Sequence, residues 1–424
     1  MPSAAPRLNV YRQPGFMPFV IARLLAVFAM QIQAIVVAWR IYEITGDPLS
    51  LAWVGLAQFL PMLFLLMPAG DLIDRYNRKL ILTLSWLGAA VCSGILLWLS
   101  TRDTPNLAWF YSALVLYGCS RAFMGPALQS LLPQIVPREQ LAQAIAANST
   151  IMRTATILGP VLGGVLYALG GGELTYTLCM LCFALGIALL TRVPVLYAEA
   201  MQITESSGWK RFTAGLHFIR SRPIILGTIS LDLFAVLLGG VIALLPIYAS
   251  DVLHVGSEGL GLLRSAMAVG EICVGLYLSA RPFNRHVGRT MFIAVAIFGV
   301  ANLVFALSTL FWLSFVALLI AGAADMVSVY IRAARIQFST PDAMRGRVNA
   351  VNMLFIGSSN ELGHFRAGTS AAWFGAVPAA LIGALCTLGV VAGWSAAFRT
   401  LRQVDRCEDA SPAAAPEPSR ATHK

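Results

Sequence analysis

The chain has 424 residues, of which 58% are hydrophobic and 12% charged, and its mean hydropathy is +0.74. This composition lies outside the range of soluble globular proteins and excludes a soluble domain of any size. The formal net charge of +10 does not indicate a nucleic-acid partner, because the basic residues are dispersed among short segments between apolar runs, as membrane topology requires.

Apolar runs long enough to cross about 30 Å of hydrocarbon as helices recur along the whole chain. They predict an all-α membrane protein, with a tight connection at Gly170–Gly172 between spans 5 and 6. Twelve spans are expected, at approximately 16–39, 49–71, 80–100, 108–131, 143–169, 174–193, 223–250, 259–280, 290–309, 311–336, 347–370 and 375–397.

Basic residues concentrate in alternate connections, which predicts that both termini are cytoplasmic. The segments on the other side hold little beyond Arg40, Arg102 and Arg366. We expect a cytoplasmic N-terminus (1–15), an N-terminal six-helix half (16–193), a cytoplasmic linker (194–222), a C-terminal six-helix half (223–397) and a cytoplasmic, largely disordered tail (398–424). Within the linker, 209–219 is amphipathic and is expected either to lie on the inner leaflet or to pack on the bundle.

A short charged strip, Gly70 to Lys79, separates spans 2 and 3 and is expected to form a tight turn at the cytoplasmic surface. Asp74 is the candidate gating residue, because its carboxylate can form charge-assisted hydrogen bonds across the seam between the halves in one state and release them in the other. The alternative is a solvated loop with no gating role. The strip resembles the loop between helices 2 and 3 of the major facilitator superfamily through Gly70, Leu72, Asp74, Arg75, Arg78 and Lys79, whereas Ile73 and Asn77 depart from that pattern.

Two motifs in the first half extend this resemblance. Arg121 to Gly125 is similar to the helix 4 motif Arg-x-x-Gln-Gly, with Met124 in place of the glutamine. The resemblance implies a role in proton coupling for Arg121, and a structural tether to backbone carbonyls is the alternative. An arginine at this depth also requires a carboxylate or a cavity nearby.

Span 5 carries a second motif, which resembles the helix 5 pattern Gly-x-x-x-Gly-Pro-x-x-Gly-Gly of drug-exporting branches, with Ala155 at the first position. Its small residues let a neighbouring helix approach closely, and the proline permits a bend. The match favours export over uptake, with close packing alone as the alternative. The residues concerned are Gly159, Pro160, Gly163 and Gly164.

The connections at 132–139 and 337–348 resemble the branch that includes bacterial enterobactin exporters and related efflux proteins. Weak matches between the two halves, at an offset of roughly 204 to 207 residues, fit the repeated six-helix halves of the superfamily. The resemblance extends from about Arg23 to Arg399 and implies a transporter that works by alternating access. It does not identify the substrate.

Four carboxylates lie within apolar spans of the second half, where an ionisable group requires a cavity or a partner. Glu271, Asp325 and Glu361 fall near the midplane, and Asp232 lies nearer the cytoplasm. They are candidates for proton coupling or for lining the cavity. Static ion pairs are the alternative, because Arg264 lies two turns from Glu271 and Arg332 two turns from Asp325 on the same helix faces.

Span 11 has a polar stripe that is expected to face the interior of the bundle. Glu361 and His364 lie one turn apart and are candidates for a proton relay, with a satisfied hydrogen-bonding histidine as the alternative. The amides of the stripe, expected to line the cavity, are Asn349, Asn352 and Asn360.

These features predict a secondary transporter of the cell (inner or plasma) membrane, not an enzyme. It is expected to export a small amphipathic compound, a siderophore or a drug, by proton antiport. A proton-coupled uptake symporter and a transport-inactive receptor or assembly partner are the alternatives. The expected partners are the substrate, protons and the lipid bilayer, and the expected state is a monomer. We expect no cofactor or metal, since the sequence has neither a Gly-x-x-x-x-Gly-Lys-Ser/Thr strip nor metal-ligand spacing.

Overall fold

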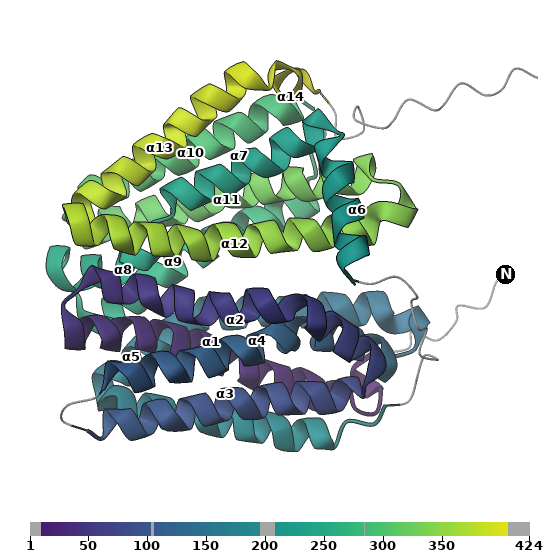
Figure 1. Ribbon diagram of the computed structural model, residues 1–424, viewed down its shortest axis with the longest axis vertical. Helices are drawn as coiled ribbons and strands as arrows, with labels where there is room; N and C mark the ends of the chain where they lie inside the picture. Colours follow the sequence, from purple (N-terminus) through teal and green to yellow (C-terminus); the bar gives the residue numbers. More distant parts are fainter. Residues whose placement is uncertain (1–9, 103–105, 196–207, 284, 406–424) are drawn as a thin grey trace, which may run out of the picture.

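The computed structural model describes residues 10–102, 106–195, 208–283 and 285–405. Every long element in this part of the chain is a helix. Figure 1 shows the helices in two bundles, with α1 to α5 in one and α7 and α9 to α13 in the other. The membrane-embedded all-α fold predicted from the hydropathy pattern is therefore confirmed.

The first bundle begins with the short helix η1 (Val10–Arg12) and contains α1 (Phe16–Thr45), α2 (Pro48–Arg75), α3 (Arg78–Ser100), α4 (Leu107–Ile135), η2 (Arg138–Gln140) and α5 (Leu141–Thr191). Side-chain caps fix three of the helix starts, because Asp47, Asn77 and Asn106 accept hydrogen bonds from the first free backbone N–H groups of α2, α3 and α4. These short Asx turns explain why the connections between long apolar runs are so compact.

Helix α5 contains the predicted spans 5 and 6. Gly170 and Gly171 have non-helical backbone angles, and Gly171 has a φ of +60° that favours glycine. The first limb runs parallel to α1, with Gly159 beside Gln31, and the second limb runs antiparallel, with Gly186 beside Ala22. The chain therefore reverses at the glycine pair, as the tight connection predicts.

The second bundle is preceded by α6 (Gly208–Arg220) and contains α7 (Pro223–Gly239), η3 (Ile242–Leu244), α8 (Leu245–Ile247), η4 (Tyr248–Val252), α9 (Gly256–Ala280), α10 (Val287–Leu307), α11 (Phe311–Ser339), α12 (Asp342–Phe374), α13 (Ala376–Ala397) and α14 (Arg399–Gln403). The predicted span 223–250 is not one regular helix, because α7 ends at Gly239 and a 3-10 turn and a π turn follow. Such π turns often occur at functional positions.

Nine stretches within the described residues are long and apolar enough to cross a membrane. The two limbs of α5 count there as one stretch, and α4 and α12 are not among the nine. The number of twelve crossings and the side on which the termini lie stay predictions.

Glycines set how closely the two bundles approach each other. A Cβ atom at Gly164 of α5 would lie 2.2 Å from the Ser257 carbonyl oxygen of α9, and one at Gly261 would lie 2.4 Å from the Pro160 carbonyl oxygen. The Ser257 hydroxyl donates to the Gly164 carbonyl at 3.0 Å. The motif of span 5 therefore acts in close packing between the bundles.

The structure defines three segments outside the predicted spans more closely than the sequence does. The strip 70–79 is mostly helical, because α2 continues to Arg75 and only Tyr76 and Asn77 separate it from α3. Helix α6 packs against α12 and α7, with Ile219 fully buried. Of the two alternatives for this segment, it therefore packs on the bundle. The predicted tail is ordered as far as 405, where the backbone of Val404 and Asp405 accepts hydrogen bonds from Gly288 and Val287. Residues 1–9 and 406–424 lie outside the described residues.

Candidate substrate and proton site

A polar cavity of about 390 Å³ lies among the helices of the second bundle, next to the first bundle. Glu271, Asp325 and Glu361, which the sequence places at similar depths on three different spans, all line it. The full lining comprises Val236, Gly240, Val241, Ile242, Arg264, Met267, Glu271, Phe298, Asp325, Asn360, Glu361, Gly363 and His364.

Glu361 of α12 connects the two bundles through an ion pair with Arg121 of α4. The Arg121 Nη1 donates to Glu361 Oε1 at 3.5 Å and to the Gln58 Oε1 of α2 at 3.4 Å. On the other side of the carboxylate, the His364 Nδ1 lies 3.7 Å from Glu361 Oε2. The structure therefore brings together Arg121, Glu361 and His364, three predicted coupling residues, and adds Gln58, which the sequence analysis missed.

Glu271 and Asp325 come to the same cavity because α9 and α11 pack through glycines. A Cβ atom at Gly270 would lie 2.0 Å from the Leu319 carbonyl oxygen, and one at Gly322 would lie 2.0 Å from the Met267 carbonyl oxygen. This close contact places the residue after Gly270 beside α11. No ion pair within the described residues involves Glu271 or Asp325.

Arg264 lies in this cavity without the static ion pair that was the alternative to a coupling role for Glu271. No such pair with Glu271 is present among the described ion pairs, although the two charges are close enough to interact electrostatically. The Arg264 Nη1 nitrogen is buried and has no hydrogen-bond partner among the described residues. A helical spacing of seven residues places two side chains on one face, but it does not determine whether their charged ends meet.

Arg332 and Asp232 form a different pair from the one that the sequence suggested. Arg332 donates to the Asp232 carboxylate, which also accepts from the Ser328 hydroxyl at 3.0 Å. The Arg332 and Asp232 side chains are only 5% and 8% exposed, so this is a static pair between α7 and α11. Asp232 is therefore not a residue of the polar cavity, and Asp325 is left without the partner that its spacing from Arg332 predicted.

The polar stripe of α12 divides along its length. Asn360 lines the cavity, as predicted. Asn349 is exposed near the start of α12, and the Asn352 Oδ1 is buried without a hydrogen-bond partner. Neither Asn349 nor Asn352 lines this cavity, so the expected position of the stripe holds only for its second half.

Two further cavities share lining residues with the polar cavity and are also lined by residues of α5. One of about 90 Å³ is lined by Gln31, Thr156, Pro160, Ile242, Arg264, Met267, Ala268 and Glu271. The other, of about 380 Å³, is lined by Arg23, Asn148, Ser149, Met152, Arg153, Thr156, Ala268, Glu271 and Ile272. Glu271 lines all three cavities. The sequence analysis missed Arg23 and Arg153. Both are arginines inside an apolar run, and this position alone would have indicated a cavity or a partner nearby.

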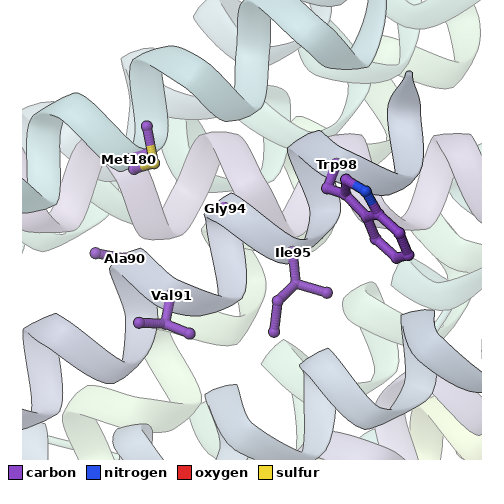
Figure 2. A pocket seen from close by; sticks show the side chains of 6 residues that line it. All are labelled: Ala90, Val91, Gly94, Ile95, Trp98 and Met180. Carbon is purple, nitrogen blue, oxygen red and sulfur yellow. The ribbon is translucent and has the colours of Figure 1, made fainter. Parts of the chain in front are cut away.

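An apolar pocket of about 460 Å³ on the first bundle has a different character. Figure 2 shows its lining side chains, with Met180 of α5 opposite the α3 residues Val91 and Ile95. None of the lining side chains is charged, and Val91 and Trp98 are 46% and 47% exposed. A surface of this kind accommodates lipid chains and offers no group for proton transfer.

The residues of the charged strip lie away from the polar cavity. The Arg78 Nη1 donates to the Ser130 carbonyl at 3.1 Å, and the Lys79 Nζ donates to the Thr191 and Val193 carbonyls at 2.9 and 2.8 Å. Both basic residues therefore hold the first bundle together. Arg75 is exposed, a Cβ atom at Gly70 would meet nothing within 4 Å, and the Asp74 side chain lies outside the described part of the structure.

The chain is similar to known exporters and to solved transporter structures. The enterobactin exporter EntS of Citrobacter koseri is 27% identical over 352 residues, which cover 80% of each chain. A variant of the nucleoside transporter NupG superposes with a TM-score of 0.69 at 13% identity, covering 90% of this chain and 99% of that one. A bacterial homologue of the human lysosomal transporter Spinster, in an inward-facing and occupied conformation, superposes with a TM-score of 0.68 at 16% identity. The match covers 91% of this chain and 96% of that one.

The family model for transmembrane secretion effectors matches residues 5–423, nearly the whole chain. The resemblance to the major facilitator superfamily and to the enterobactin-exporter branch is thereby confirmed. This multi-pass inner membrane protein belongs to the transmembrane secretion effector family of major facilitator transporters.

Proposed function

We propose that this transporter exports a small amphipathic compound by proton antiport. The observation that carries the proposal is the cluster of Arg121, Glu361 and His364, in which a carboxylate of one bundle is held by an arginine of the other. Protonation of Glu361 removes its negative charge and weakens the link between the bundles, so proton binding changes the free energy of their relative movement. A proton site of this kind couples directly to alternating access.

In the proposed cycle, the substrate enters the polar cavity from the cytoplasm and displaces protons from its carboxylates. The cavity then opens to the outside, the substrate leaves, and protons from the outside neutralise Glu361, Glu271 or Asp325. Export as the direction is supported by the helix 5 motif and by the similarity to EntS. Asp74 is proposed as the gating residue at the cytoplasmic seam, within the strip Gly70, Asp74, Arg75, Arg78 and Lys79.

The test is proton release, read with a pH dye, when siderophores and amphipathic drugs are added to the detergent-purified protein. The native chain is expected to release protons on binding, and Glu361→Gln is expected to release fewer protons because one of the three cavity carboxylates is gone. Glu139→Gln is the matched control, since Glu139 is an exposed carboxylate in η2. Binding without proton release from the native chain would overturn the coupling.

Transport in liposomes tests the direction and the choice of carboxylate. With a proton gradient imposed, Glu271→Gln, Asp325→Asn and Glu361→Gln are each compared with the native chain. Unchanged proton-driven transport in all three variants would remove these carboxylates from the mechanism. Accumulation rather than exclusion of the compound by cells that express the chain would favour the uptake symporter.

A further inference from the structure

The polar cavity contains charges of both signs that form no ion pair with another of the described residues. On the positive side, the Arg264 Nη1 is buried and makes no hydrogen bond with the described residues. On the negative side, Glu271 and Asp325 line the same cavity, and the described part of the chain has no ion pair to either carboxylate. Buried charges of this kind cost free energy unless a ligand or a proton compensates them.

We propose that this cavity binds a zwitterionic ligand, whose oxyanion accepts from Arg264 and whose ammonium group contacts Glu271 and Asp325. This inference rests on the proposed transport function and adds the substrate class. A guanidinium matches a carboxylate or a similar oxyanion because its donors lie in one plane. Two carboxylates that make no ion pair with the described residues match an ammonium group in the same way.

The spacing of the two sites sets the length of the ligand. Arg264 and Glu271 are seven residues apart on α9, so their Cα atoms are separated by about 10 Å along the helix axis at 1.5 Å per residue. Both side chains extend into the same cavity, which shortens the distance between their charged ends. A ligand of dipeptide length therefore spans the two sites, and the cavity volume of about 390 Å³ is within the range of small-molecule pockets.

Apolar side chains between the charged sites account for the amphipathic character of the ligand. Val236, Ile242, Met267 and Phe298 line the cavity together with the charged residues. An apolar ligand body that covers these side chains is removed from water when the ligand binds. The charges determine the two ends of the ligand, and the apolar lining determines its middle.

The surrounding charges explain how ligand binding releases a proton. Glu271 is approached by Arg264 of its own helix, Asp325 of α11 and Arg153 of α5, and Arg23 of α1 lines the adjoining cavity. Glu361 and His364 of α12 also line the polar cavity, and Glu361 is paired with Arg121 and lies beside the His364 ring. In this proposal the two carboxylates share one proton in the absence of ligand, because a like charge nearby disfavours ionising both. When an ammonium group arrives, that proton leaves to solvent and the cation takes its place, so charge is conserved at the site.

Four dipeptide probes of nearly equal size test the inference. They are the zwitterionic dipeptide of two phenylalanines, its C-terminal amide, its N-acetyl form and its N-acetyl amide. The first carries both charges, the second only the ammonium, the third only the carboxylate and the fourth neither. Affinity for the purified full chain is measured by isothermal titration calorimetry, and proton release is followed with a pH dye. We expect the zwitterion to bind about tenfold or more tightly than either singly charged probe, because each lost contact leaves a buried charge unpaired.

Variants assign each end of the ligand to its residue. In Arg264→Gln the zwitterion and its amide are expected to bind equally, whereas the preference for a free ammonium remains. In Asp325→Asn the affinities for the zwitterion and for its N-acetyl form are expected to become similar. Arg264→Lys keeps the positive charge and is expected to retain part of the carboxylate preference. Arg281→Gln and Glu258→Gln are the controls, because these exposed residues lie at the ends of α9.

The outcomes separate this inference from the proposed antiport. If the amide binds as tightly as the zwitterion and releases as many protons, the zwitterion assignment fails and antiport stands. If the zwitterion is preferred without proton release, the ligand assignment stands and antiport fails. Equal affinity for all four probes in the folded native chain would overturn the site. Folding of each variant is checked by size-exclusion chromatography and thermal unfolding in detergent.

Discussion

The pair between Asp232 and Arg332 shows how a buried charge inside a membrane span can be purely structural. Both side chains are almost completely buried, and Ser328 completes the hydrogen bonding of the carboxylate. Removing one member leaves the other charge uncompensated in a medium of low dielectric constant. We therefore expect stability, and not transport, to depend on this pair.

This interpretation predicts opposite results for single and paired substitutions. Asp232→Asn is expected to destabilise the fold by about 3 to 5 kcal/mol, because it leaves Arg332 buried without a counter-charge. The double variant Asp232→Leu with Arg332→Met replaces both charges with apolar groups and is expected to recover most of that loss. Thermal unfolding in detergent measures both effects. Proton-coupled transport that disappears in a stable double variant would instead place the pair in the coupling mechanism.

The contrast between Arg332 and Arg264 marks the limit of sequence reasoning at the level of residues. The apolar context of each arginine correctly indicates that it needs a partner or a cavity. Their positions along α11 and α9 identify carboxylates on the same face, Asp325 and Glu271, but the partner of Arg332 is Asp232 of another helix. Spacing along one helix contains no information on which neighbouring helix supplies a charge. The meeting of Arg121 with Glu361 was likewise set by tertiary packing, because α2 packs against both α4 and α12.

At the level of elements, hydropathy and turn chemistry predicted the helices well. The reversal at Gly170 and Gly171 follows from two consecutive glycines between apolar runs. The charged strip was less predictable, because α2 continues to Arg75 and Asn77 alone caps the next helix. Helix α6 also required the tertiary structure, since an amphipathic pattern fits a membrane surface and a helix bundle equally well.

The glycines of α5 provide a test of packing between elements. Gly164→Ala is expected to destabilise the closed seam by about 1 to 3 kcal/mol, because the added Cβ would lie 2.2 Å from a backbone oxygen of α9. Gly389→Ala in α13 is the control, since a Cβ atom there would meet nothing within 4 Å. Thermal unfolding and initial transport rates of the two variants are compared. Equal thermal stability and equal transport rates of the two variants would show that α9 can move away from α5 without a loss of free energy.

At the level of the whole molecule, three of the described hydrogen bonds between the two bundles lie toward one end. Figure 1 places α6 and α14 at one end of the bundles and α8 at the other. Toward the α8 end, Tyr42 of α1 donates to Asp251 of η4, and Ser257 and Ser265 of α9 donate to the Gly164 and Ile157 carbonyls of α5. These contacts close the seam on the side that we propose to face outward.

Of these three contacts, the hydrogen bond between Tyr42 and Asp251 can be removed with the smallest change to the rest of the structure. Tyr42→Phe keeps the ring, which is 8% exposed among apolar neighbours, and removes only the hydroxyl that donates to Asp251. A hydrogen bond from a hydroxyl to a charged acceptor contributes about 1.5 to 3 kcal/mol, and this one is part-buried. The variant is therefore expected to populate the state open at the α8 end roughly tenfold or more above the native chain.

Spin labels placed on either side of the α8 end, at the exposed positions Glu43 and His254, measure the opening as a longer distance by pulsed electron resonance. Asp251→Asn is expected to shift the distance in the same direction but less, because an amide oxygen still accepts from the Tyr42 hydroxyl. Tyr277→Phe, an exposed tyrosine in α9 near the other end, is the control. A native distance distribution in Tyr42→Phe would mean that the serine contacts of α9 and α5 hold the seam without this hydrogen bond. The closing of that end would then depend on helix packing, and Gly164→Ala would be expected to open it where Tyr42→Phe does not.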